Sequence, residues 1–406
     1  MLRQINFYSI CFAFGLSVLL ILAGSRYTDN ANYRPVSESH RNVRNFLRIV
    51  NDDEVYQPQT IKPYDDAEKV IELQRLKIEA ELSHYNLSGT GHKLKELVPE
   101  AGGRPVRSMI VSTWRSGTTF LGEILNAIPG NFYHYEPLLK YDIIQIRGPP
   151  HADDALTLLN NMFKCNFHGM DDYFEFGREH SYQFSHNTRL WDHCKYKRAL
   201  CVDSNFTTRF CKLFPYQSMK VVRLRLRLIE DILQDKELSN LKAVLLVRDP
   251  RGAMQSRQHR EWCLPAPDCW SPELMCADMI SDYVALTRLQ KKFPNRVTVV
   301  RYEDFSLNVT SETRRLLSFL GLSMSTALEE FLQTHTNKEG AGVSSTFRVS
   351  HEVPFKWRNV LKYEYVSQIQ DVCSEAMELW GYRPAHNRSH MQSEQFVPIG
   401  PYRVAL

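Results

Sequence analysis

Residues 107–127 of this chain read RSMIVSTWRSGTTFLGEILNA. An apolar run comes first, a short polar loop follows, and apolar residues then recur at helical spacing. The stretch therefore predicts a buried strand, a tight loop and a helix. In the register of the phosphate-binding loop GxxxxGK[ST], Gly117 and Thr119 fit, whereas Ser112 and Thr118 replace the first glycine and the lysine.

The predicted loop contains the groups that bind an oxyanion. Backbone N–H groups at the start of a helix are unpaired and lie at the positive end of the helix dipole. The hydroxyls of Ser116, Thr118 and Thr119 and the guanidinium of Arg115 accompany them. These groups predict a phosphate or sulfate site at residues 113–119.

Apolar runs alternate with helical patterns through the rest of the body. This order is typical of an α/β fold, and we expect a P-loop-like three-layer domain with a mainly parallel sheet flanked by helices. Ligands of such sheets bind beyond the carboxyl ends of the strands, so residues 113–119 should lie near segments 248–251 and 302–304. The expected strands are 109–113, 219–226, 242–247 and 297–301, and the expected helices are 117–128, 229–234, 272–292, 311–320 and 365–380.

A second basic motif, LLVRDPRGAMQSRQHR, occupies residues 245–260. Arg248 stands at the end of an expected strand, where a guanidinium can bind an anion through two N–H groups. Ser256 and Arg260 are four residues apart and would share one face of a helix, so they could join Arg248 on one phosphate. A surface ion pair between Arg248 and Asp249 is the simpler alternative.

The N-terminal part contains the uncharged run FYSICFAFGLSVLLILAG at residues 7–24. This run is long enough to cross a membrane, so we expect a transmembrane signal anchor after a cytoplasmic tail at 1–6. A cleaved signal peptide is the alternative, because small residues end the run. Both interpretations place the remaining chain in the secretory lumen. Four glycosylation sequons agree with that location, at Asn86, Asn205, Asn308 and Asn387.

Residues 25–104 are polar and irregular and are expected to form a luminal stem. A charged helical segment near residues 66–85 carries a loose apolar stripe. This stripe could pair two stems into a homodimer, or it could pack against the body.

Nine cysteines are present, and Cys11 lies in the apolar run, which leaves eight that can form disulfides. Only the pair Cys263 and Cys269 is predicted, because the prolines of CLPAPDC bend a short loop. The spacings contain no C-x2-C or H-x3-H pair, so a zinc site is not expected. The net charge of +4 does not indicate nucleic-acid binding.

Together these motifs resemble the sulfotransferases that use 3′-phosphoadenosine 5′-phosphosulfate, and among them the Golgi carbohydrate 6-O-sulfotransferases. The resemblance covers residues 105–383 and implies a catalytic domain at 105–390 with a C-terminal tail at 391–406. The matching segments are TWRSGTT at 113–119, FYHYEPL at 132–138, RDPRGAMQS at 248–256, VRYEDF at 300–305 and FKWR at 355–358.

This resemblance implies sulfate transfer to the 6-hydroxyl of galactose, N-acetylgalactosamine or N-acetylglucosamine in a glycoprotein or proteoglycan. It places the enzyme in the Golgi membrane as a single-pass type II protein with a luminal catalytic domain. No metal is predicted, because no Mg²⁺-binding carboxylate is evident and a singly charged sulfonate needs less neutralisation than a triphosphate. The implied donor-binding residues are Thr113, Trp114, Arg115, Ser116, Gly117, Thr118 and Thr119 for the phosphosulfate, Arg248 and Ser256 for the 3′-phosphate, and Arg260, Tyr302 and Lys356 as further candidates.

The acceptor hydroxyl needs a base, and we predict Glu136 for this role beside the catalytic Arg115. Partial burial in the tyrosine-rich segment would raise the pKa of Glu136 toward neutrality. A structural carboxylate paired with arginine is the alternative interpretation of Glu136, and His134 is the rival base.

Acceptor recognition is expected from residues 142–214, which contain Trp191 and many other aromatic side chains. Arg223, Arg225 and Arg227 would lie on one face of an extended strand and would suit an acidic glycan, or they could simply be solvated. A luminal nucleotide kinase remains an alternative function, although the loop lacks its lysine. A catalytically silent glycan-binding protein is the other.

Overall fold

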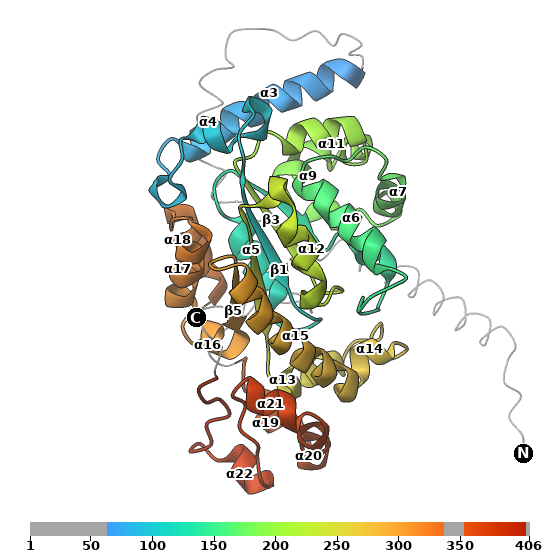
Figure 1. Cartoon of the computed structure of the whole chain (residues 1–406), viewed down its shortest axis with the longest axis vertical. Coiled ribbons are helices and arrows are strands. Elements are labelled where there is room, and N and C mark those ends of the chain that lie inside the picture. Colours follow the sequence, from blue (N-terminus) through green and yellow to red (C-terminus); the bar gives the residue numbers. More distant parts are fainter. Residues whose placement is uncertain (1–62, 337–352, 403–406) are drawn as a thin grey trace, which may run out of the picture. The chain divides into compact units, whose positions relative to one another are not determined.

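Five parallel strands form the sheet at the centre of the computed structural model, in the order β2–β3–β1–β4–β5 (Figure 1). The structure describes residues 63–336 and 353–402 of the chain. All residues of β3 and β5 are buried, as expected for parallel strands that helices cover. The strands are β1 Val106–Val111, β2 Asn131–Tyr135, β3 Tyr216–Val221, β4 Leu241–Val247 and β5 Val297–Arg301.

Helices surround this sheet, and the predicted parallel α/β fold is confirmed. Helix α15 has the predicted bounds, whereas the helix predicted at 365–380 is divided into α20 and α21. The helices are α3 Pro63–Leu82, α4 Leu94–Leu97, α5 Thr118–Asn126, α6 Ala152–Phe163, α7 Asp171–Glu179, α8 Tyr182–Ser185, α9 Thr188–Cys194, α10 Arg198–Cys201, α11 Ser204–Cys211, α12 Glu230–Gln234, α13 Pro250–Arg257, α14 Pro267–Trp270, α15 Pro272–Lys292, α16 Tyr302–Leu307, α17 Val309–Leu320, α18 Thr326–Thr336, α19 Trp357–Val360, α20 Tyr363–Val372, α21 Ser374–Leu379 and α22 Arg388–Gln392.

Three strands differ from the sequence prediction by more than one residue. The strand expected at 109–113 is β1, which starts at Val106 and ends at Val111, and the strand expected at 219–226 is β3, which starts at Tyr216 and ends at Val221. Strand β2 was not predicted as a strand, because its NFYHY sequence shows no clear alternation of polar and apolar residues. It forms one edge of the sheet and pairs with β3 in parallel, so that Tyr135 lies opposite Lys220.

The apolar stripe of helix α3 packs against the body. Ile71, Ile78 and Leu82 are buried and belong to the same hydrophobic core as the sheet. All the described residues belong to one compact unit. Residues 63–104, which the sequence analysis assigned to a stem, are thus part of this unit, because the stripe buries its side chains there rather than in a second stem.

The last described residues also pack on the body. Phe396 is buried, and the ring of Tyr402 lies 6.0 Å from that of Trp380. Residues of the expected C-terminal tail at 391–406 therefore pack on the body. The predicted tail at 1–6 and anchor at 7–24 lie outside the described residues, and within the described ranges no helix has the length and apolarity to cross a membrane.

The predicted disulfide between Cys263 and Cys269 is present. The other six cysteines beyond residue 62 are also paired, so disulfides account for every cysteine in the described ranges. These pairs are Cys165–Cys211, Cys194–Cys201 and Cys276–Cys373.

Candidate functional site

The loop between β1 and α5 has the backbone geometry of a tight turn around a ligand. Arg115 and Gly117 both have positive φ, of 64° and 92°. A Cβ atom on Gly117 would lie 2.4 Å from Cδ2 of Tyr302, so only glycine fits under this ring. Tyr302 begins helix α16 at the end of β5, and the sheet thus brings the 302–304 segment to the loop as predicted.

The RDPRGAMQS segment meets the same loop. The Nε of Arg115 donates a hydrogen bond to the Oγ of Ser256 over 3.0 Å. Arg248 donates to the backbone oxygen of Arg115 over 2.7 Å, and its guanidinium lies 4.3 Å from the centre of the Tyr302 ring. Residues from the ends of three strands therefore converge at the loop. Arg248 is buried, so it is not half of a surface ion pair with Asp249.

Three buried polar atoms at this convergence have no hydrogen-bond partner among the described residues. They are the Oγ of Ser116, the Nε of Arg248 and the indole Nε1 of Trp114. Buried polar atoms in proteins are nearly always paired, with protein, water or ligand. A hydroxyl and a guanidinium left in this state, at the start of a helix, fit an anionic ligand.

Glu136 lies buried directly after β2, in a strained backbone conformation with φ of 40°. Its Oε1 is 2.7 Å from the Nζ of Lys220, and its Oε2 accepts a hydrogen bond from Arg223. Burial by itself would raise the pKa of Glu136, but the positive charges of Lys220 and Arg223 outweigh burial and lower it. The expectation of a raised pKa is therefore wrong, and Glu136 is ionised at neutral pH.

Lys220 connects Glu136 to the loop. Its side chain is 1% exposed, and its Nζ lies 3.4 Å from the Oγ1 of Thr119 and 4.2 Å from the centre of the Tyr135 ring. Burial would lower the pKa of Lys220, but the charge of Glu136 reverses this and raises it. The sequence analysis did not include Lys220 in the site, although a lysine inside the apolar strand sequence SMKVV was a signal for such a role.

His134, the rival base, lies in the core. Its ring packs against Phe132, Phe163 and Phe167, with 4.9 Å between its centre and that of Phe132. Burial lowers the pKa of His134 to about 3. The side chain is therefore neutral and enclosed by aromatic rings, which cannot exchange a proton with it. His134 is thus poorly placed to act as the base.

Two further candidates, Arg260 and Lys356, lie after the end of α13 and at the start of α19. Helix α13 ends at Arg257, so Arg260 does not share a helical face with Ser256. Lys356 is exposed and comes directly before α19. The next residue, Trp357, packs under Arg251 of the RDPRGAMQS segment, with 4.1 Å from guanidinium to ring centre.

The arginines after β3 do not form an exposed basic row. Arg223 binds Glu136, and Arg225 is buried in an ion pair with Asp282 over 3.0 Å. Arg227 donates to the backbone oxygen of Arg147. The strand ends at Val221, so the alternation that would have aligned these three side chains does not continue.

The region expected to recognise the acceptor forms helices α6 to α11. Trp191 packs against the core and is only half-buried. Nearer to Glu136, the ring of His186 stacks on Tyr135 with 3.7 Å between centres. Tyr182 of α8 is 47% exposed, and the charges of Arg223 and Glu136 act on its hydroxyl.

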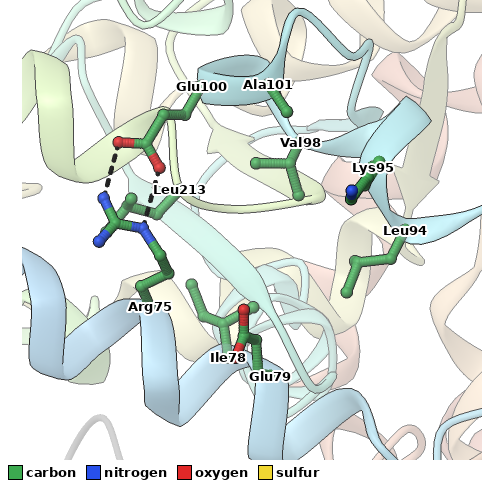
Figure 2. A pocket seen from close by; sticks show the side chains of 9 residues that line it. All are labelled: Arg75, Ile78, Glu79, Leu94, Lys95, Val98, Glu100, Ala101 and Leu213. Carbon is green, nitrogen blue, oxygen red and sulfur yellow. Dashed lines mark hydrogen bonds and ion pairs between the residues drawn. The ribbon is translucent and has the colours of Figure 1, made fainter.

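A cavity of about 180 Å³ lies elsewhere, between α3 and the segment 94–101 (Figure 2). Arg75 and Glu100 form a two-bonded ion pair across it. None of the predicted site residues lines this cavity. Among residues 63–336 and 353–402, no group of three or more His, Cys, Asp or Glu side chains is arranged to hold a metal ion.

Comparison with known proteins agrees with the arrangement of these motifs. Carbohydrate sulfotransferase 4 of Mus musculus is 28% identical over 327 residues, which cover 70% of this chain and 83% of that protein. Carbohydrate sulfotransferase 6 of Homo sapiens is 26% identical over 340 residues, which cover 73% and 85%.

Among solved structures, the sulfotransferase domain of the Synechococcus PCC 7002 olefin synthase aligns with 66% of this chain and 94% of its own. Its identity is 15% and its TM-score 0.36, a likeness too low to support an argument. The family comparison is independent of that likeness, and residues 105–381 match the sulfotransferase domain. This chain therefore belongs to the sulfotransferase domain family.

Proposed function

We propose that this enzyme transfers sulfate from 3′-phosphoadenosine 5′-phosphosulfate to the 6-hydroxyl of a galactose, N-acetylgalactosamine or N-acetylglucosamine residue in a glycoprotein or proteoglycan. The observation that carries the proposal is the contact between the loop and the RDPRGAMQS segment, through Arg115, Ser256 and Arg248. This contact would bring the residues proposed to bind the phosphosulfate next to those proposed to bind the 3′-phosphate of the same donor. The carbohydrate acceptor follows from the similarity to carbohydrate sulfotransferases.

The donor fits the residues around the loop. Ser116, Thr118 and Thr119 would bind the phosphosulfate together with the amides at the start of α5. Arg248 and Ser256 would bind the 3′-phosphate, which ATP lacks, and Tyr302 lies against both segments. The donor supplies an activated sulfonate, and the protein supplies position and positive charge.

Transfer needs one bond to form and one to break. The acceptor oxygen bonds to sulfur while the bond from sulfur to the 5′-phosphate oxygen breaks, and the electron pair leaves with the phosphate. The hydroxyl proton passes to Glu136, whose carboxylate oxygens keep free lone pairs beside Lys220 and Arg223. Arg115 and Lys220 would stabilise the charge that develops on the leaving phosphate.

The proposed setting is the Golgi lumen, with residues 7–24 as a single-pass type II anchor. The four sequon asparagines are all exposed, which supports access for glycosylation. Eight paired cysteines agree with an oxidising compartment. Membrane extraction and glycosidase digestion of the expressed full chain would test this setting.

The test of the activity is a transfer assay with the full-length chain, radiolabelled phosphosulfate and a panel of galactose, N-acetylgalactosamine and N-acetylglucosamine glycans, with ATP as a competing donor. Arg115→Ala and Glu136→Gln should each lower kcat by about 10²-fold or more. Arg314→Ala on the exposed surface of α17 is the matched control and should leave kcat unchanged. Absence of transfer to any glycan would refute the proposal, and full activity of Glu136→Gln would remove the proposed base.

A further inference from the structure

We propose that Arg257 is a positioning residue that clamps the donor loop to the disulfide-closed loop Cys263–Cys269, so that donor affinity depends on this disulfide. The inference rests on the proposed function of the loop at residues 113–119. Neither Arg257 nor the disulfide was among the residues predicted to bind the donor.

Arg257 is the last residue of α13 and is 1% exposed. Its guanidinium donates hydrogen bonds to both loops. Its Nε and one terminal nitrogen donate to the backbone oxygen of Trp114 over 3.2 and 3.0 Å. The same terminal nitrogen donates to the Oγ1 of Thr113 over 2.8 Å. The other terminal nitrogen donates to the backbone oxygen of Cys269 over 2.8 Å.

All three hydrogen-bond acceptors of Arg257 are uncharged. A buried guanidinium without a carboxylate partner is costly, and burial lowers the pKa of Arg257 to about 9. The charges of Arg225, Arg115 and Arg248 act on this pKa in the same direction, and the charge of Asp278 opposes them. A purely structural role would be served better by an uncharged side chain, whereas an anionic donor would compensate this group of cations.

The disulfide supports the loop from a second direction. Cys263 and Cys269 are buried and pack with Trp114 and Val222 in a small apolar cluster apart from the main core. Trp114 is thus held by the disulfide at its ring and by Arg257 at its backbone oxygen. Any displacement of the Trp114 backbone would also move Arg115, the next residue of the loop.

The short disulfide loop is itself fixed on its other side. Asp268 accepts a hydrogen bond from the backbone N–H of Gln145 over 2.6 Å and pairs with Arg147 over 2.8 Å. The side chain of Gln145 in turn donates to Thr113 over 3.3 Å. The loop 263–269 therefore serves as a rigid support for residues 113 and 114.

The experiment measures binding of adenosine 3′,5′-bisphosphate, the product left by the donor, to the full-length chain by calorimetry. The clamp variants are Arg257→Lys, which keeps the charge but cannot reach three acceptors, and the double variant Cys263→Ala/Cys269→Ala. Each should weaken binding about tenfold. Arg257→Lys loses hydrogen bonds from a charged group to the loop, and the cysteine variant loses the closure that keeps residues 263–269 rigid.

Two matched controls separate positioning from general destabilisation. Arg296→Lys removes an arginine that also donates to three backbone oxygens, those of Leu233, Leu238 and Leu241. Cys194→Ala/Cys201→Ala opens a disulfide of similar span, with a separation of 7 residues against 6. Both should change the affinity less than twofold while lowering the Tm.

The outcomes discriminate between the two proposals. If the unmodified chain does not bind the bisphosphate, the proposed donor is wrong. If it binds and the clamp variants bind equally well, or lose no more affinity than the controls at a comparable Tm, the clamp is refuted. The clamp is supported if both clamp variants bind the bisphosphate more weakly and neither control variant does.

Discussion

Lys220 and Glu136 illustrate how single residues at this site depend on each other. Each is buried and charged, which would be unfavourable in isolation. Their contact of 2.7 Å keeps both ionised, lowering the pKa of the carboxyl and raising that of the amine. Lys220 also contacts Thr119, so the proposed base and the donor loop are joined through one side chain.

Glu303 is another buried carboxyl, in the first turn of α16. Its Oε1 accepts a hydrogen bond from the backbone N–H of Asp249 over 3.0 Å. Its Oε2 accepts a hydrogen bond from the hydroxyl of Tyr382, also over 3.0 Å. Burial, followed by the charge of Asp249, raises the pKa of Glu303 from 4.5 to about 7, while Arg248 acts in the opposite direction. The RDPR turn is thus held by a carboxyl that is partly protonated near neutral pH.

The raised pKa predicts how stability varies with pH. A carboxyl with a higher pKa in the folded state binds its proton more tightly there, so its contribution is complete below pH 4.5 and is lost as the pH rises through about 7. The free energy of unfolding of the unmodified chain, relative to that of Glu303→Gln, should fall by on the order of 2 kcal/mol over this range. Urea unfolding at several pH values would measure it, and parallel curves for the two chains would contradict the shift.

At the scale of elements, the turn into α5 depends on Gly117. A side chain there would meet the Tyr302 ring at 2.4 Å in a backbone conformation of φ 92°. Gly117→Ala should therefore weaken binding of adenosine 3′,5′-bisphosphate at least tenfold and cost about 1–3 kcal/mol of stability.

Gly169 provides the matched control for this element. It also has positive φ, 73°, but no atom lies within 4 Å of a Cβ built on it. Gly169→Ala should cost only the backbone strain, about 1 kcal/mol, and leave binding intact. Equal effects of the two alanines on binding would show that contact with Tyr302 does not matter.

Helix α3 provides another test at this scale. Ile78 is 3% exposed in the core, whereas Leu76 on the same helix is 55% exposed. Ile78→Ala should lower the free energy of unfolding by about 2–4 kcal/mol, and Leu76→Ala by less than about 0.5 kcal/mol. A negligible effect of Ile78→Ala in thermal or urea unfolding would mean that α3 does not pack on the body in solution.

For the whole molecule, the disulfide Cys276–Cys373 connects α15 to the C-terminal helices across 97 residues of sequence. It joins the end of α20 to a helix that packs on the sheet through β5. The C-terminal segment also supplies Tyr382, which binds Glu303, so its attachment reaches the RDPR turn.

Closing a longer loop restricts the unfolded chain more strongly. Cys276→Ala/Cys373→Ala should therefore destabilise the protein by about 2 kcal/mol more than Cys194→Ala/Cys201→Ala, whose loop spans 7 residues. Calorimetric unfolding would compare the two variants. A larger loss from the short loop would show that native contacts, and not chain entropy, dominate.

Much of the fold could be predicted because its signals are local. The strand and loop at 107–117 and the helix at 272–292 follow from apolar spacing and from Ser271 as a cap, whose side chain accepts the N–H of Leu274. Strand β2 could not be predicted in this way, because what makes it a strand is its pairing with β3.

The sequence by itself determined the loop at residues 113–119, the order of the motifs and the ends of β4 and β5, because each depends on neighbours a few residues away. Only the tertiary structure decided that α3 belongs to the body and that Arg225 points inward to Asp282. It also decided the ionisation of Glu136. The pKa of that carboxyl depends on charges such as Arg223, 87 residues along the chain, which only folding brings into contact.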